Sequence, residues 1–471
     1  MALFDRSALN PGVPPKEVAA WAMYDFANSG YTTVVLTAVF NAYFVGVVAQ
    51  RADWATLAWT LALAVSNIAV TLTMPAIGAW ADLHAAKKRL LVLSTIGCVL
   101  ATAALAWAGR GDVALAMVVI ALSNYFYSVG EALSGAFLPE LARSESMGRV
   151  SGWGWSFGYF GGMLTLGLSL AWVISAQGRG QTAEQFVPVT MLITAGVFAL
   201  ASLPVFLVLR ERAVPGARPP SGPGAQRGAS GSALSGGQGA PRERPLQQMA
   251  PQQTALQETA LQRVAATLRK ARLYRDFWRL MLCGAAYQAG ISVVIALAAV
   301  YAEEAMGFQQ QQTMLLVFLV NIAAALGAFQ FGYVQDRIGH KAALAVTLVG
   351  WIVMVLVAGL SSSVAAFWVA AVIAGLCMGS SQSCGRAMVG YLTPERHLAE
   401  FYGLWALATR ASAVIGPLTY GLVTWLTDGN HRLAILVTGL FFVAGLWLLR
   451  GLDVQRGREV ATLADAPPAR A

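Results

Sequence analysis

The sequence has few charged residues. Only 12% of its 471 residues are Asp, Glu, Lys or Arg, whereas 57% are hydrophobic and the mean hydropathy is +0.59. Soluble domains carry roughly 25% charged residues, so this chain could not cover the surface of the ~3 soluble domains that its length would allow. A bilayer requires no charged coat, because a spanning helix needs only ~20 apolar residues. The composition therefore predicts an integral membrane protein.

Cysteine and histidine are also scarce, with four of each. The cysteines lie inside apolar runs and form no CxxC pair, which argues against a disulfide framework or a zinc site. The histidines lie in or beside polar connections, so we expect no metal or haem between helices and no cofactor. A proton relay would have to use carboxylates.

Signatures of enzymes and of ATP use are missing as well. The sequence contains no Walker-type GxxxxGK[ST] and no HExxH. A membrane-embedded enzyme would need a catalytic cluster at one depth, and no histidine lies inside an apolar run. We therefore expect neither an enzyme nor an ATP-driven pump.

Twelve apolar stretches are long enough to span a bilayer, and a long polar segment divides them six and six. We expect an N-terminal segment (1–17), a six-helix bundle (18–209), a linker (210–276), a second six-helix bundle (277–450) and a tail (451–471). The predicted spans are 18–49, 54–81, 88–109, 113–138, 150–175, 186–209, 277–301, 311–335, 341–361, 364–393, 399–425 and 430–450.

Basic residues gather in alternate loops. One side receives both termini and the linker, whereas the opposite loops hold only Arg51, Arg110, Arg179 and Arg432. The positive-inside rule then places both termini and the linker in the cytoplasm. The net charge of +9 is thus explained by topology rather than by nucleic-acid binding. The Ala- and Arg-rich composition suggests a bacterial inner membrane.

The linker has two parts of different composition. Residues 213–254 are rich in Pro, Gly, Ser, Ala and Gln and predict disorder. Residues 255–275 predict a basic amphipathic helix, which either lies on the anionic inner leaflet or simply leads into the seventh span.

Two loops repeat one pattern at equivalent places. The loop after the second span reads Gly78-Ala-Trp-Ala-Asp82, with Lys87 beyond, and the loop after the eighth reads Gly332-Tyr-Val-Gln-Asp336-Arg337-Ile-Gly339-His-Lys341. Two copies indicate a duplicated architecture. The glycines would permit close helix contact, and the aspartates would favour the positive ends of neighbouring helices. The alternative interpretation is that these charges only set topology.

The second copy resembles the signature GxxxDRxGR[RK] of the major facilitator superfamily. Further segments resemble the "unknown major facilitator" family, which includes vacuolar amino-acid effluxer-like proteins: Trp21-Ala-Met-Tyr24-Asp25-Phe26-Ala27-Asn28-Ser29 in the first span, Gly154, Gly158 and Gly162 in the fifth, and Gly379-Ser-Ser-Gln382-Ser-Cys-Gly-Arg386 in the tenth. The resemblance implies a major facilitator fold, a gate at the repeated loops, and export of amino acids or related solutes. The seventh span lacks the acidic residue usual in relatives.

Four charged residues lie inside the predicted spans: Asp25, Glu131, Arg386 and Arg410. Charges there are costly and usually mark function. Together with polar neighbours at helical spacing they predict a substrate and proton cavity lined by Asp25, Asn28, Ser29, Asn124, Glu131, Gln288, Gln382, Arg386 and Arg410. We expect Asp25 and Glu131 to pair with Arg386 when the gate is shut, while Arg410 binds a substrate carboxylate. The alternative is a static ion pair that only fixes helix packing.

The sequence thus predicts an all-α, twelve-helix secondary transporter in the bilayer that works as a monomer by alternating access. Two acids and two bases in the spans suit a zwitterion such as an amino acid, with export and proton coupling expected. A drug, organic-ion or peptide transporter, or a non-transporting scaffold or sensor, stays open as an alternative.

Overall fold

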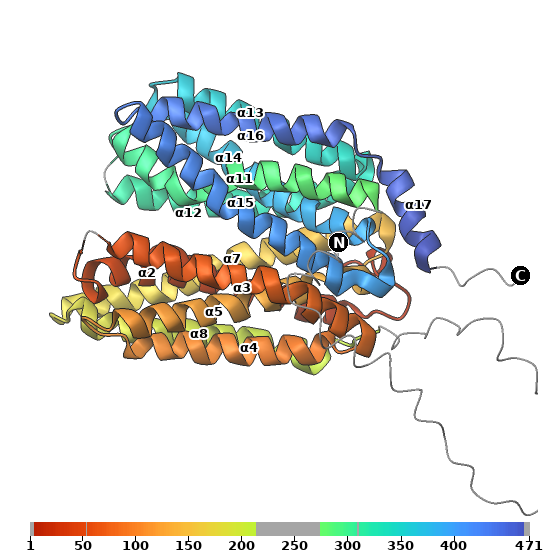
Figure 1. Cartoon of the computed structure of the whole chain (residues 1–471), viewed down its shortest axis with the longest axis horizontal. Helices are drawn as coiled ribbons and strands as arrows, with labels where there is room; N and C mark the ends of the chain where they lie inside the picture. Colours follow the sequence, from red (N-terminus) through yellow and green to blue (C-terminus); the bar gives the residue numbers. More distant parts are fainter. Residues whose placement is uncertain (1–3, 53, 213–273, 309, 466–471) are drawn as a thin grey trace, which may run out of the picture.

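A computed structural model describes residues 4–52, 54–212, 274–308 and 310–465 of the chain. Its long helices form two bundles that lie side by side (Figure 1). The N-terminal bundle, here called the N half, contains α1 (Pro15–Tyr31), α2 (Phe40–Tyr43), α3 (Ala55–His84), α4 (Lys87–Ala104), α5 (Val113–Gly135), α6 (Leu138–Leu141), α7 (Met147–Gly178) and α8 (Ala183–Val208).

The C-terminal bundle, here called the C half, repeats this arrangement. It contains α11 (Arg275–Glu304), α12 (Gln310–Ile338), α13 (His340–Leu360), α14 (Val364–Tyr391), α15 (Leu398–Leu426) and α16 (His431–Arg450), followed by α17 (Val454–Asp465). Short 3-10 turns lie at Arg6–Ala8, Leu105–Trp107, Ser144–Ser146 and Glu395–His397.

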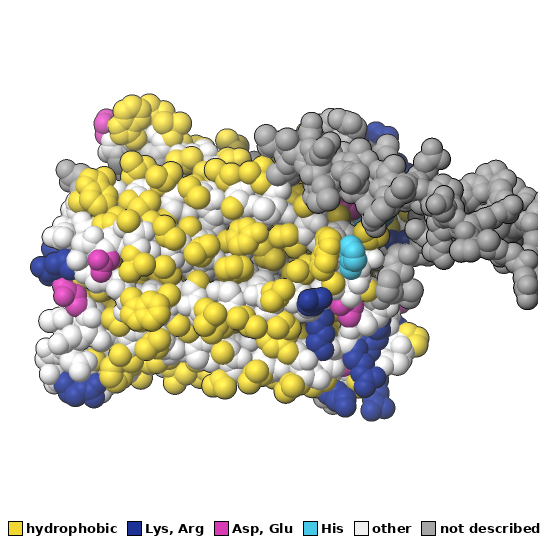
Figure 2. All heavy atoms as spheres, turned by 60° about the horizontal axis from the view of Figure 1, so that its bottom comes forward, with side chains coloured by type: hydrophobic (Ala, Val, Ile, Leu, Met, Phe, Trp, Pro, Cys, Tyr) yellow, Lys and Arg dark blue, Asp and Glu magenta, His cyan; other side chains and the backbone are white. Residues whose placement is uncertain are grey.

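The bundles are suited to a bilayer. In the described residues, eleven helical segments are long and apolar enough to cross a membrane. The twelfth, α15, has 29 residues but carries Arg410 and Pro417 within its length. Large apolar side chains such as Leu100 and Leu440 are exposed on the sides of the molecule. Figure 2 shows hydrophobic side chains spread over one side and basic residues at both ends, in greater number at one of them.

The first predicted span is not one continuous α-helix. After α1 the backbone forms π-helical turns over Thr32–Ala38 and Phe44–Val48, with α2 between them. Five of the first six residues of this stretch are β-branched, and such side chains crowd the preceding turn of a helix. The Thr37 hydroxyl also donates to the carbonyl of Thr32, five residues back. The sequence pattern revealed the length of this span but not its interruption.

Both described ends of the chain lie at the same end of the bundles, here called the terminus face (Figure 1). The halves meet through α7 against α12 and α14, and through α15 against α3 and α5. Among the described residues, the hydrogen bonds that join the two halves run from the terminus face inward to a Glu131–Arg410 pair. These hydrogen bonds therefore hold the two halves together at the terminus face.

The tail folds further than its sequence predicts, because α17 packs on the terminus face through buried Gly457 and Ala461. The predicted disordered segment 213–254 lies outside the described residues, and so does the predicted amphipathic helix up to residue 273.

Candidate functional site

Arg386 on α14 crosses from the C half into a pocket of the N half. Its Nη1 donates to Asp25 Oδ2 at 2.6 Å, and its Nη2 donates to the carbonyl oxygen of Ser151 at 2.8 Å. The guanidinium lies 4.7 Å from the ring centre of Trp21 and 5.4 Å from that of Trp155. The side chains of the ion pair are only 11% and 12% exposed. A carboxylate and two aromatic faces, all from the N half, thus neutralise the buried cation.

Glycines in α7 make this pocket possible. A Cβ on Gly154 would lie 2.6 Å from Arg386 Nη2 and 2.8 Å from Trp21 Cζ3. One turn further along, a Cβ on Gly158 would lie 2.8 Å from Ser29 Oγ, so α7 packs closely along α1. The glycine-rich run therefore provides both the helix contact and the room for the guanidinium.

A second ion pair also joins the two halves. Arg410 Nη2 on α15 donates to Glu131 Oε2 on α5 at 2.5 Å, and its guanidinium lies 5.3 Å from the ring centre of Tyr127. Arg386 and Arg410 of the C half are thus each held by a carboxylate and at least one aromatic ring of the N half.

This second pair corrects the prediction that Glu131 would share Arg386 with Asp25. The reason is helix packing, since α5 faces α15 whereas α14 faces α7. Counting depth along each span separately cannot reveal which helices face each other. Arg410 Nε is buried with no hydrogen-bond partner in the described structure. The prediction that Arg410 binds a substrate carboxylate stays a prediction.

The uncharged residues predicted to line the cavity lie within one half or the other. Asn124 donates to Ser66 Oγ at 2.9 Å and so ties α5 to α3. Gln288 donates to Gln382 Oε1 at 2.6 Å, which ties α11 to α14.

On α1, Asn28 and Ser29 lie one turn from Asp25. Asn28 is buried, and its Oδ1 has no hydrogen-bond partner within the described structure. Ser29 faces Gly158 of α7.

The two repeated aspartates cap helices of the opposite half. Asp82 accepts hydrogen bonds from the backbone N–H groups of Ala399 and Glu400 at the start of α15, at 3.2 and 3.1 Å. Asp336 accepts from Gly148 and Arg149 at the start of α7, at 3.1 and 3.3 Å. Each carboxylate therefore binds the positive end of a helix whose own preceding residue makes no side-chain cap.

The repeated glycines lie at the same two contacts. A Cβ on Gly78 would lie 2.6 Å from the carbonyl oxygen of Ala399, and a Cβ on Gly332 would lie 2.7 Å from that of Gly148. Any larger residue would push these helices apart.

The other motif residues have separate roles. Lys87 is buried and forms an ion pair with Glu140 in its own half. Lys341 donates to the carbonyls of Arg450 and Leu452, Arg337 is exposed, and Gly339 adopts a φ of +88° that favours glycine.

Several residues of the site had not been predicted. They are Trp21 and Trp155 around Arg386, Arg149, which donates to Asp336 at 3.0 Å, and Arg458 of α17, which donates to Ser144 of the N half at 2.8 Å. The helical spacing of Trp21 and Asp25 was visible in the sequence, but these aromatic residues also fit interface anchors or core. Within the described residues no group of three or more His, Cys, Asp or Glu side chains could hold a metal ion.

Comparison with known proteins agrees with this architecture. A family model described as "Vacuole effluxer Atg22 like" matches residues 40–462. The uncharacterized MFS-type transporter YxiO of Bacillus subtilis is 22% identical over 454 residues, which are 95% of this chain and 97% of that protein. Autophagy-related protein 22-1 of Aspergillus niger is 27% identical over 212 residues, which are 41% of this chain and 34% of that protein.

Solved structures show the same fold. The proton:xylose symporter XylE matches with a TM-score of 0.70 and 13% identity, over 96% of this chain and 98% of that chain. The human organic anion transporter MFSD10 matches with a TM-score of 0.65 and 16% identity, over 93% and 100% of the two chains. The chain therefore belongs to the Atg22-like vacuole effluxer family and is an MFS-type membrane transporter, not an enzyme.

Proposed function

We propose that the protein exports an amino acid or similar zwitterion by proton-coupled alternating access. In this proposal the terminus face is cytoplasmic, because the basic loops lie on that side. The observation that carries the proposal is the two ion pairs, each of which joins a carboxylate of the N half to a guanidinium of the C half. The Asp25–Arg386 pair is buried, whereas the Glu131 carboxylate of the Glu131–Arg410 pair is 40% exposed.

Opening the terminus face would break both ion pairs together. Two carboxylates would then remain on the N half and two guanidinium groups on the C half. For the buried Asp25–Arg386 pair, removal of one partner leaves an uncompensated charge in a low-dielectric interior, which costs roughly 3–5 kcal/mol; water reduces this cost at the half-exposed Glu131. A proton or an ammonium group would neutralise the carboxylates, and a carboxylate would bind the guanidinium groups. A zwitterion offers both charges in one molecule.

The same geometry supports coupling to protons. When the terminus face is closed, the Arg386 guanidinium binds the Asp25 carboxylate, and a proton bound to Asp25 would remove that attraction. Protonation and closure therefore compete for Asp25. Such competition links proton movement to the change between the two states.

Counterflow in proteoliposomes tests this function. The liposomes are preloaded with a mixed amino-acid pool, and exchange is measured with and without an imposed pH gradient. We expect saturable exchange that the gradient strengthens and that Asp25→Asn lowers at least about tenfold, a loss of ~1.4 kcal/mol of coupling. Glu131→Gln tests the second pair in the same way.

Glu184→Gln is the matched control, because Glu184 forms an exposed pair with Arg110 within the N half, at 3.0 Å. It should leave exchange unchanged. Full, gradient-dependent exchange in Asp25→Asn would contradict proton coupling at this site and favour a static pair. Exchange of peptides, organic ions or drugs but of no amino acid would replace the proposed substrate, and no flux at all would favour a scaffold or sensor.

A further inference from the structure

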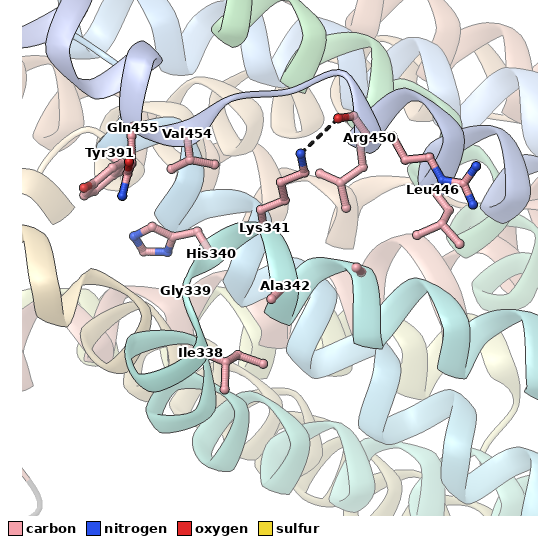
Figure 3. Close-up of a pocket in the computed structure, with 12 residues that line it drawn as sticks. Ile338, Gly339, His340, Lys341, Ala342, Tyr391, Leu446, Arg450, Val454 and Gln455 are labelled. Atoms are coloured by element: carbon pink, nitrogen blue, oxygen red, sulfur yellow. Dashed lines mark hydrogen bonds between the residues drawn. The ribbon is translucent and has the colours of Figure 1, made fainter.

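A cavity of about 550 Å³ lies at the terminus face of the C half, away from the two ion pairs. Its walls come from the first turn of α13, the end of α14, the last turns of α16 and the start of α17 (Figure 3). A groove of about 440 Å³ adjoins it and shares four lining residues, which are Lys341, Arg450, Val454 and Gln455. The cavity is within the roughly 300–1,000 Å³ range of small-ligand sites.

The polar rim of this cavity is basic. Lys341 and Arg450 line both the cavity and the groove, and Arg279 and Arg456 line the groove. Lys341 Nζ donates to the carbonyl oxygens of Arg450 and Leu452 at 2.9 and 2.7 Å, which leaves one of its three N–H donors. Arg450 is exposed and has no ion-pair partner in the part of the chain that the structure describes.

Acidic groups neutralise this rim only in part, because Asp276 pairs with Arg456 and lies 3.9 Å from Arg279 but does not pair with Lys341 or Arg450 in the described structure. Asp453 is the one carboxylate that lines the groove, and Asp276 is already bound by Arg456 at 2.7 Å. The free guanidinium of Arg450 and the remaining donor of Lys341 can therefore serve an anionic ligand.

The cavity lies at the depth of lipid headgroups. His340 and Arg450 are the end residues of two membrane-spanning segments, so the basic rim lies at the membrane boundary. Leu446 lies four residues deeper on α16, about 6 Å at 1.5 Å per residue, and Leu449 and Ala345 continue the apolar wall. A polar rim above an apolar wall matches a phosphate group followed by its acyl chains.

We propose that this cavity binds an anionic phospholipid, with the phosphate at Lys341 and Arg450 and an acyl chain along Leu446 and Leu449. A free phosphate ion has the charge for the rim but leaves the apolar wall uncovered. The bound lipid would contact α13, α16 and α17 together and so stabilise the attachment of α17. This assignment is independent of the transported substrate.

Native mass spectrometry of the full-length protein in detergent tests the proposal. The protein is titrated with a short-chain phosphatidylglycerol or with phosphatidylcholine of the same chain length. We expect the wild type to bind phosphatidylglycerol more tightly, and Arg450→Gln to raise its Kd about fivefold, the effect of one cation at an anionic surface. The matched control is Arg432→Gln, at the opposite end of the same helix, which should leave the Kd unchanged.

Two further measurements distinguish a bound phospholipid from a bound free phosphate ion. Inorganic phosphate should not compete with phosphatidylglycerol at equal concentration, and Leu446→Gln should weaken lipid binding although it removes no charge. Equal affinity for the two lipids, an unchanged Kd in Arg450→Gln, or full competition by inorganic phosphate would each overturn the proposal. The Arg450 side chain forms no hydrogen bond or ion pair within the described structure, and a thermal unfolding curve verifies that the variant is folded.

Discussion

Arg386 reaches Asp25 through a space that only glycine leaves open. The missing side chain of Gly154 admits the guanidinium between the rings of Trp21 and Trp155, which lie 4.7 and 5.4 Å from it. The strength of the ion pair therefore depends on a neighbour that carries no charge. This dependence can be tested without altering either ionised group.

Gly154→Ala should weaken the contact between the halves. The added methyl group would clash with Asp25 Oδ2, so it must displace Asp25, Arg386 or Trp21, and overpacking of this kind costs typically about 1–3 kcal/mol. Thermal unfolding in detergent measures the loss of stability. Labelling of a cysteine at position 383, introduced into a chain without its four native cysteines, measures opening, because Ser383 is buried beside Ser151. We expect faster labelling in Gly154→Ala.

Gly167→Ala is the control for this prediction, since it lies in the same helix and a Cβ there meets nothing within 4 Å. Alanine is favoured over glycine in helices by about 1 kcal/mol, so this variant should be as stable as the wild type or more so. Equal labelling rates in the two variants would show that Gly154 does not control the ion pair.

At the scale of helices, two aspartates hold the halves together in the same way. Asp82 binds the second and third residues of α15, and Asp336 binds the second and third residues of α7. The two contacts differ in one respect, because the Arg149 side chain also donates to Asp336 at 3.0 Å. The duplicated motif therefore makes two contacts between the halves, and these contacts differ in strength.

Asp336→Ala should open the terminus face more than Asp82→Ala does. Loss of a helix cap costs about 1 kcal/mol, and the additional charged hydrogen bond from Arg149 adds roughly 1.5–3 kcal/mol. Spin labels at the exposed positions 89 and 337, one in each half, report the distance across this face. If the distribution of spin-label distances broadens equally in both variants, or in neither, the two caps do not differ in strength and the prediction is wrong.

The helix α17 in the C-terminal tail makes a third contact between the halves. Arg458 donates to Ser144 Oγ of the N half and lies over the ring of Tyr391, while Asp465 accepts from the backbone N–H of Glu395. The tail helix α17 thus contacts both halves.

Arg458→Ala and Ser144→Ala should have effects that are not additive. Each single change removes the same hydrogen bond, worth about 0.5–1.5 kcal/mol, so the double variant should lose less stability than the sum. Glu459→Ala, at the exposed neighbour of Arg458, is the control. Additive losses in thermal unfolding would show that the bond contributes nothing to joining the halves.

At the scale of the whole molecule, the hydrogen bonds between the halves gather toward one face in the described residues. Both described ends of the chain also lie at that face, where basic residues are concentrated (Figure 1, Figure 2). If this face is cytoplasmic, the described structure, in which hydrogen bonds join the halves at this face, is closed to the cytoplasm. The orientation of the protein in the membrane therefore decides on which side of the membrane the two ion pairs close the transporter.

Cysteine labelling in intact cells tests this orientation. A membrane-impermeant reagent should label a single cysteine at position 180, in the loop between α7 and α8, but not one at position 459 in α17. The physical reason is that positively charged loops stay on the cytoplasmic side. Labelling at position 459 and protection at position 180 would reverse the proposed topology and the direction of closure.

Much of the fold follows from the sequence by itself. The low charge and the apolar runs require a membrane, and the repeated Gly-to-Asp motif reveals the duplication, because these signals are local along the chain. Four intramembrane charges also stand out locally, because burial of each one is costly wherever the helices pack.

Only the tertiary structure decided which of these charges meet. Pairing depends on which helix faces which, and that is set by contacts between residues hundreds of positions apart, such as Asp25 and Arg386. Glu131 was therefore assigned the wrong partner from its depth in the span, whereas α5 in fact faces α15 and Arg410. The placement of Trp21 and Trp155 around Arg386 and the docking of α17 were hidden for the same reason, since a side chain acquires its surroundings only when distant segments pack together.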